Sequence, residues 1–227
     1  MKKHLNNLLI FGTLFFTLPA CQTSTSTTVE APAPKKNYAD LLSSYSPLSI
    51  DSLLVYYTDS EVKEHKYYGT ALDSTLLNLL PPNYDAENRF GEFFACYKFE
   101  IDKQRTGLIT RVPGEYVSSR LDLLIYNAGT DTIEDQFMLA DVFGDAGDVY
   151  VRNSLLFFNQ KKLQVFVEDY SSYDHSVDDE KDSTVTESTT YFALDLANSK
   201  HDTISKNDSL FIKRYLRLCK SKAKEAS

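Results

Sequence analysis

Residues 92–101 read EFFACYKFEI, and the two-residue alternation of this stretch decides the fold class. One face carries the apolar side chains of Phe93, Ala95, Tyr97, Phe99 and Ile101, and the other carries Glu92, Lys98 and Glu100 with Phe94 and Cys96. Successive side chains of a β-strand point to opposite faces, so this period is typical of a half-buried strand. We therefore expect a strand here with one apolar face.

Six further stretches downstream have the composition of strands. They are residues 106–112, 120–126, 133–143, 149–158, 163–170 and 184–196. Turn residues separate them, as in Val112-Pro113-Gly114 and in the segment Gly144-Asp145-Ala146-Gly147-Asp148. Consecutive strands joined by short turns pair antiparallel. The expected fold is mainly β, an antiparallel sheet, sandwich or partial propeller-like meander, with short helices near the domain ends.

The expected helices flank this run of strands. Residues 38–45 suit a turn or two of helix, and Asp73-Ser74 suits the N-cap of a helix through Leu80 that prolines stop. Near the end, Asp208 or Ser209 suits a cap, and the next residues place five side chains on one helical face: Phe211, Ile212, Tyr215, Leu216 and Cys219. This last stretch also alternates as a strand, so both interpretations stay open.

The first 20 residues have the layout of a secretory signal peptide. Lys2 and Lys3 are followed by an apolar stretch, residues 8–16, and then by a short exit that ends at Ala20. A helix that crosses a bilayer needs about 20 largely apolar residues, and this stretch is shorter. We therefore interpret residues 1–20 as a removable leader.

The exit reads Leu18-Pro19-Ala20-Cys21 and resembles the lipobox of bacterial lipoproteins. The resemblance implies that the Cys21 thiol receives a diacylglycerol group and that the leader is cut before this cysteine. Two or more acyl chains hold a protein stably on a membrane. In enteric bacteria, an Asp directly after the lipidated cysteine retains a lipoprotein in the inner membrane. Gln22 stands at this position here, so the sorting rule implies the outer membrane. The resemblance thus predicts a bacterial, lipid-anchored envelope protein.

Composition divides the rest of the chain. Residues 21–37 comprise the lipidated cysteine and a flexible linker rich in Ser, Thr and Pro. The linker has too few apolar residues to bury enough surface to fold. Residues 38–220 suit a single β-rich domain, and residues 221–227 a disordered tail. The chain has 24 Lys and Arg against 32 Asp and Glu, and loss of Lys2 and Lys3 with the leader leaves 22 against 32. This acidic balance argues against nucleic acid as a partner.

Three cysteines are present, and lipid on Cys21 would leave Cys96 and Cys219. An oxidising envelope would permit a disulfide between them. Two unpaired thiols are the alternative, since cysteine often behaves as a small buried hydrophobe.

The most site-like passage contains Asp141, Asp145 and Asp148 among glycines. Oxygen-rich loops with glycines for tight turns suit calcium, but the spacing lacks the EF-hand order, and a hairpin turn with solvated acids is the alternative. A second acidic run spans residues 174–182 and includes His175, and we interpret it as a solvated loop. The sequence predicts no other cofactor.

Catalytic signatures are weak. The sequence has no G-x-S-x-G, zinc spacing, P-loop or dinucleotide fingerprint, and His65, His175 and His201 stand in polar surroundings. The chain has 15 Tyr and 14 Phe and no Trp, which modestly favours recognition of a protein or glycan. Our first hypothesis is a non-enzymatic envelope module that binds a protein or glycan. An envelope hydrolase that uses carboxylates such as Asp141 and Asp145, and a calcium-stabilised β module, are the alternatives.

Overall fold

The computed structural model describes residues 37–57, 66–82, 84, 92–114, 119–178 and 180–196, with 209–210, 212–213 and 215–217 near the end. The chain divides into two units, Met1–Lys35 and Lys36–Ser227, and every described residue belongs to the second. The leader, the Cys21 lipobox, nearly all of the linker, Cys219 and the tail lie outside the described residues. The predictions for them stay predictions.

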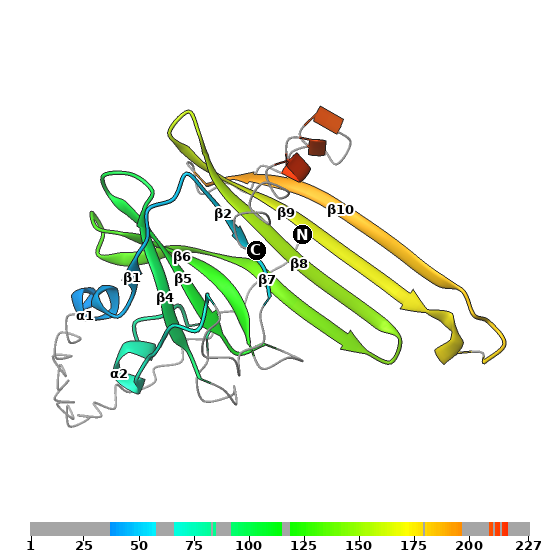
Figure 1. Cartoon of the computed structure of the whole chain (residues 1–227). Helices are drawn as coiled ribbons and strands as arrows, with labels where there is room; N and C mark the ends of the chain where they lie inside the picture. Colours follow the sequence, from blue (N-terminus) through cyan, green and yellow to red (C-terminus); the bar gives the residue numbers. More distant parts are fainter. Residues whose placement is uncertain are drawn as a thin grey trace, which may run out of the picture. The chain divides into compact units, whose positions relative to one another are not determined.

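The second unit is built mainly from strands (Figure 1). The strands are β1 (Ser46–Pro47), β2 (Ser52–Val55), β3 (Thr70–Ala71), β4 (Phe94–Glu100), β5 (Arg105–Val112), β6 (Arg120–Asn127), β7 (Thr132–Asp145), β8 (Asp148–Asn159), β9 (Lys162–Asp174) and β10 (Val185–Asp195). The helices are α1 (Tyr38–Ser43), α2 (Ser74–Leu77) and the single 3₁₀ turn η1 (His175–Val177).

The strands join in one sheet with the order β1-β4-β5-β6-β7-β8-β9-β10, while β3 pairs with β4 and β2 with β8. From β4 to β10 each strand pairs antiparallel with the next, which confirms the mainly β, antiparallel fold class. All seven predicted strands are present. The sequence analysis missed β1, β2 and β3, which have two to four residues and are too short to display a period.

Helices α1 and α2 agree with the predictions in position, whereas η1 lies in the acidic run that we interpreted as a loop and was not predicted. The Asp73 carboxylate accepts hydrogen bonds from the backbone N–H groups of Thr75 and Leu76, both at 2.9 Å, and so caps α2. This helix ends at Leu77, three residues before the predicted end. The described residues between 209 and 217 are helical, which decides the open alternative in favour of a helix. The proposed cap at Asp208 lies outside the described residues.

The alternation within β4 is interrupted, and the prediction of one apolar face was wrong. Ala95 pairs with Thr110 and Tyr97 with Ile109, so Cys96 is an extra residue in a β-bulge. Phe93 and Ala95 therefore pack on one side of the sheet, and Phe99 and Ile101 pack on the other. Buried side chains from this stretch thus lie on both faces of the sheet, which a single alternating pattern does not anticipate.

A central cluster joins the two halves of the sheet. The first half comprises β1, β3 to β6 and residues 132–140 of β7, and the second comprises residues 141–145 of β7 with β2 and β8 to β10. Buried members from the two halves include Phe99, Ile109, Leu123, Leu139, Leu156, Val165, Val167 and Leu194. Across from Phe99 stands Gly107, where an added Cβ would lie 2.4 Å from the phenyl ring. Glycine therefore permits this close approach.

The outer faces of both halves are covered too. On the first half, α1 and α2 with their flanking segments contribute Tyr38, Leu41, Leu72, Leu79, Leu80 and Tyr84 to a helix-side cluster. On the second half, Tyr215 of the C-terminal helical segment stacks on Phe166 with ring centroids 3.8 Å apart. Residues in the middle of the strands are thus buried on both faces of the sheet.

Strand β7 passes from one half of the sheet to the other. Its residues up to Ala140 pair with β6, and from Asp141 onward they pair with β8. At this crossover the buried Ser154 hydroxyl donates a hydrogen bond of 2.6 Å to the Leu139 carbonyl. Beyond the crossover, β7 to β10 run on as a ribbon.

Candidate functional site

The ribbon comprises residues 141–145 of β7, 148–153 of β8, 168–174 of β9 and 185–191 of β10. Figure 1 shows these strand ends running on beyond the other described strands of the unit. The pairing is continuous: Asp141 faces Arg152, Arg152 faces Asp169 and Asp169 faces Thr190. Directly opposed residues of antiparallel strands project to the same face. The register therefore assigns every ribbon side chain to one of two faces.

The first face carries an ion pair between neighbouring strands. The Arg152 guanidinium donates two hydrogen bonds of 2.7 Å to the two oxygens of Asp169, a bidentate geometry. The Tyr150 hydroxyl donates to the same carboxylate at 3.0 Å. Burial and the Asp169 charge raise the pKa of Tyr150 to about 12, against the opposing effect of Arg152. The Phe192 ring lies 5.6 Å from the guanidinium carbon, so the arginine is held by charge and by aromatic contact.

A second ion pair lies in the first half of the sheet. Asp122 is fully buried and accepts hydrogen bonds from the Tyr84 hydroxyl, from Arg120 at 3.2 Å and 3.3 Å, and from Gln136 at 3.2 Å. Burial raises the pKa of Tyr84 above its ordinary value, and the Asp122 charge raises it too. Because the Asp122 carboxylate is closed to solvent and already bonded to three side chains, it does not face a substrate.

Asp141 lies in the electrostatic field of both ion pairs, at the crossover of β7. Burial raises the pKa of its carboxyl group above the ordinary range, although the Val142 N–H, at 2.9 Å, and Arg120 oppose the rise. The charge of Asp122 acts in the same direction as burial, and Arg152 acts against it. The sequence-predicted Asp141 is thus a half-buried acid in a mixed-charge cluster.

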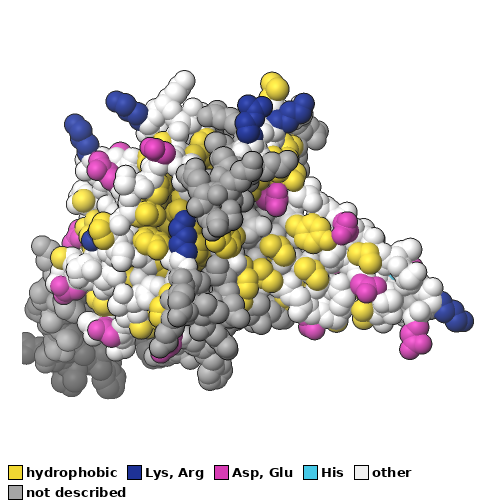
Figure 2. Space-filling model, in the orientation of Figure 1, with side chains coloured by type: hydrophobic (Ala, Val, Ile, Leu, Met, Phe, Trp, Pro, Cys, Tyr) yellow, Lys and Arg dark blue, Asp and Glu magenta, His cyan; other side chains and the backbone are white. Residues whose placement is uncertain are grey.

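The second face of the ribbon carries a row of apolar side chains. Val142 lies opposite Val151, Val151 opposite Tyr170, and Tyr170 opposite Thr189. All of them are partly or fully accessible, and the neighbouring Val149 is 40 % exposed. Figure 2 shows hydrophobic side chains along the ribbon as well as on the rest of the unit. The second face thus presents Val142, Val151, Tyr170 and Thr189 as one row that is at least partly accessible to solvent.

The described residues of the acidic run, 174–178 and 180–182, comprise the last residue of β9, the 3₁₀ turn η1 and part of the connection to β10. The Asp174 carboxylate caps η1 by accepting a hydrogen bond of 2.9 Å from the Ser176 N–H. Hydrogen bonds from Ser176 also lower the pKa of the Asp174 carboxyl group. A ring nitrogen of His175 lies 2.7 Å from the Thr186 hydroxyl, and the Tyr173 hydroxyl donates to Asp178 at 2.6 Å. These acids organise the turn through local hydrogen bonds.

The structure does not bring Asp141, Asp145 and Asp148 together. Asp145 and Asp148 are paired at the end of the β7–β8 hairpin, whereas Asp141 stands four residues earlier in the same strand. That spacing corresponds to about 13 Å along a strand, too far for one ion. Within the part of the chain that the structure describes, no three His, Cys, Asp or Glu side chains are grouped to hold a metal.

Cys96 is a buried thiol in the β4 bulge. It is 3 % exposed, and its Sγ donates to the Tyr67 carbonyl at 3.2 Å. Burial raises the pKa of this thiol to about 12, against the opposing effect of Arg111. The structure records Cys96 as a free thiol, and its predicted disulfide partner, Cys219, lies outside the described residues.

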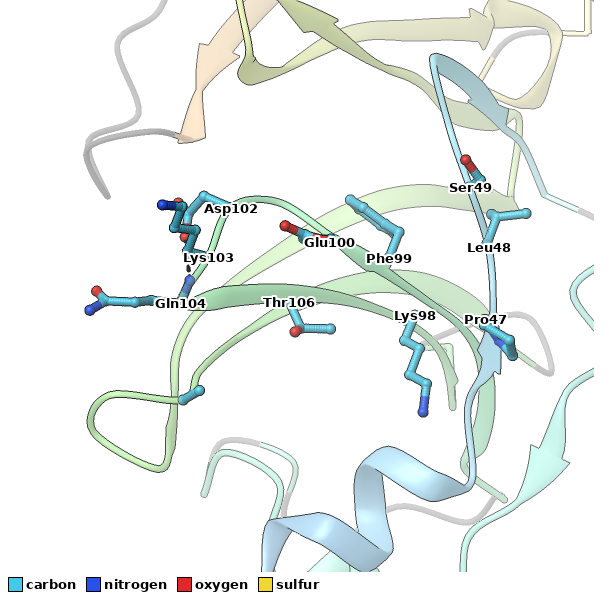
Figure 3. Close-up of a pocket in the computed structure, with 11 residues that line it drawn as sticks. Pro47, Leu48, Ser49, Lys98, Phe99, Glu100, Asp102, Lys103, Gln104 and Thr106 are labelled. Atoms are coloured by element: carbon cyan, nitrogen blue, oxygen red, sulfur yellow. Dashed lines mark hydrogen bonds between the residues drawn. The ribbon is translucent and has the colours of Figure 1, made fainter.

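An open hollow of about 910 Å³ lies beside β1 and β4 (Figure 3). In the figure, the Lys98 side chain points toward α1, and its Nζ donates to the Leu42 carbonyl at 2.7 Å. Asp102 is bonded to Arg105 through distances of 2.6 Å and 2.7 Å. Although burial opposes it, hydrogen bonds from Gln104 and Arg105 lower the pKa of Asp102. Both charged groups are thus engaged in holding the fold.

In comparisons with known proteins, no family model, curated protein or solved structure matched this chain. A search of the described helices for one long and apolar enough to cross a bilayer found none.

Sequence reasoning found Asp141 but missed the residues around it. Arg152 and Asp169 are 17 positions apart, and Tyr84 and Asp122 are 38 apart, so only the strand register brings them together. One signal was available, because a charged residue inside an apolar strand needs a partner. Asp122 within RLDLLIY is such a residue.

Proposed function

We propose that this chain is a lipid-anchored protein of the bacterial cell envelope, tethered through Cys21 to the outer membrane, and that it acts there as a non-enzymatic binding module. The observation that carries the binding role is the ribbon, whose continuous ladder holds two accessible faces in fixed register. The partner is another envelope component, a protein or a glycan.

The sequence before the domain supports the address. A leader, a lipobox and a Ser/Thr/Pro-rich linker follow one another over residues 1–37. A flexible chain of about 15 residues spans on the order of 20 Å, which would hold the domain clear of the lipid headgroups.

The chemistry of the ribbon supports recognition. Tyr150, Tyr170 and Tyr173 present aromatic area that is already fixed by hydrogen bonds to Asp169, Glu187 and Asp178. Side chains ordered before binding lose less entropy when a partner arrives. Tyrosine also combines an apolar ring with a polar hydroxyl, which suits protein and glycan surfaces.

The anchor is tested by metabolic labelling with a radioactive fatty acid. Cys21→Ser should abolish incorporation of the label and move the protein from the membrane pellet to the soluble envelope fraction. Cys219→Ser is the matched control and should keep both the label and the pellet. Label retained in Cys21→Ser would contradict the proposal.

The binding surface is tested by photo-crosslinking in intact cells. A photoreactive residue at Val149, on the ribbon, should form an adduct with an envelope component, while one at the exposed Thr130 should not. Adding Tyr170→Ala should reduce the Val149 adduct at least tenfold, because truncating a central aromatic costs about 2 kcal/mol of binding. Equal adducts from both positions would refute the ribbon as the binding surface.

A further inference from the structure

The C-terminal helical segment, described at residues 209–210, 212–213 and 215–217, lies with one face against the sheet (Figure 1, orange to red). Ile212 and Tyr215 are three positions apart and pack on the cluster that contains Phe166 of β9. Tyr215 is 3 % exposed and stacks on the Phe166 ring. Residues three or four positions apart share a helix face, so these contacts fix which face of the segment is turned outward.

The outward face combines leucines with cations, and we name it the leucine–cation face. It consists of Leu210, Lys213, Leu216 and Arg217, in which Lys213 is three positions from each leucine and four from the arginine. Leu210 is 76 % exposed, the most exposed large hydrophobic side chain in the described part of the chain, and Leu216 is 38 % exposed. Lys213 and Arg217 are exposed too, and over the described residues neither forms an ion pair.

The charge of this end of the chain is opposite to that of the rest. Six of the 24 Lys and Arg residues, but only one of the 32 Asp and Glu residues, lie in residues 213–227. A local cluster of one sign attracts a partner of the other sign even when the whole chain carries the opposite net charge. The leucine–cation face therefore suits a partner that is negatively charged.

We propose that the leucine–cation face docks on the anionic lipid surface of the membrane that carries the chain. A membrane interface offers phosphate groups for Lys213 and Arg217 and, directly beneath them, acyl chains for Leu210 and Leu216. Lysine and arginine can lay their stems along apolar surface and keep their charges at the headgroups. A nucleic acid backbone would match the cations but would leave the leucines in water.

The proposal rests on the proposed function for the tether that brings the face to the membrane. With Cys21 anchored, docking is an intramolecular step at a high effective concentration, so a small contact area is enough. Each Lys or Arg close to an anionic leaflet raises the affinity about fivefold. Loss of both Lys213 and Arg217 should therefore weaken docking about 25-fold.

The test uses a single tryptophan as a reporter, because the chain has none of its own. The full chain with Leu210→Trp is reconstituted into vesicles of phosphatidylglycerol or of phosphatidylcholine, both with brominated acyl chains, and the floating fraction is collected. Bromine quenches tryptophan that enters the acyl region, and interfacial helices bury their apolar side chains about 5–10 Å deep. Emission should fall by about half or more in phosphatidylglycerol and stay unchanged in phosphatidylcholine.

Two further variants make the test specific. Thr130→Trp places the reporter in the exposed turn between β6 and β7 and should stay unquenched in both vesicles. Adding Lys213→Gln and Arg217→Gln to Leu210→Trp should abolish the quenching at an unchanged melting temperature, because both cations are exposed. The proposal is overturned if position 210 is not quenched in phosphatidylglycerol, if position 130 is quenched equally, or if quenching survives loss of the two cations.

The same samples separate docking from anchoring and from another occupant. Failure of the chain to float with phosphatidylcholine would refute the Cys21 anchor, whereas flotation without quenching in phosphatidylglycerol would refute only the docking. A blue shift of the Leu210→Trp emission with soluble polyglutamate, but not with phosphatidylglycerol, would make an acidic protein the occupant and would overturn the membrane proposal.

Discussion

The same strands behave differently in their middle and at their outer ends. In β8, residues 154–157 are buried on both faces, between the central cluster and the cluster around Phe166 and Tyr215. In the same strand, residues 148–153 are half-buried or exposed. The hydrogen-bonded ladder with β9 is unbroken across both parts. The backbone alone therefore does not separate the core from the surface, and side-chain burial does.

This difference assigns separate tasks to the two parts. Burial of apolar area is the main source of folding stability, so the middle of the strands carries most of it. The ribbon is ordered by the backbone hydrogen bonds between β7, β8, β9 and β10, and its side chains remain at least partly accessible. Substitutions in the middle should therefore change stability, and matched substitutions in the ribbon should change it little.

The largest effect is expected from the two Asp–Arg pairs. Asp122→Ala leaves Arg120, Tyr84 and Gln136 without their shared acceptor in a buried site and should lower the free energy of unfolding by about 3–5 kcal/mol. Asp169→Ala breaks the pair with Arg152, in which the two side chains are 17 % and 19 % exposed, and should cost less, about 1–2 kcal/mol. Urea denaturation of both variants measures the difference. Equal losses would show that burial does not distinguish the two regions.

A smaller difference is expected from one valine in each region. Val167 is fully buried in the central cluster, and Val167→Ala should lower the free energy of unfolding by about 2 kcal/mol, through lost apolar burial and the cavity left behind. Val151→Ala removes the same two methyl groups from the accessible ribbon face and should cost less than about 1 kcal/mol. A larger loss for Val151→Ala in the same urea titrations would refute the division of tasks.

The fold was predictable because its long strands have strong local patterns. The runs at 106–112 and 120–126 are apolar on both faces and correspond to β5 and β6, which are covered on both sides. The bulge at Cys96 was not predictable, because an extra residue leaves the alternation of the letters unchanged and shows only in the partner register.

The candidate site was predictable only in part. Asp141 was identified as a site residue for its acidic, glycine-rich neighbourhood, but the structure places it beside Arg120 and Arg152 and far along the strand from Asp145. The difference arises because a sequence gives the order of the acids and not the strand on which each neighbour lies. Charge clusters of this kind form only when the tertiary fold brings residues from different strands together.

The smallest effect is expected at Asp141, between the two regions. Because the pKa of its carboxyl group is raised in the folded state, folding favours the protonated form. Its contribution to stability is therefore present below the unfolded-state pKa of about 4 and is lost as pH rises through the folded-state value. Asp141→Asn keeps an acceptor for the Val142 N–H and has no charge to bury. This variant should gain stability over the wild type, by about 0.5 kcal/mol or less, as pH rises from 3 to 7.

Urea unfolding of both proteins at pH 3, 5 and 7 measures this gain. Asp145→Asn is the control for loss of one negative charge, because Asp145 is exposed on the same strand. If Asp141→Asn instead lost stability relative to wild type as pH rose, the ionised carboxylate would be stabilising the fold. Its two arginine neighbours would then outweigh its burial.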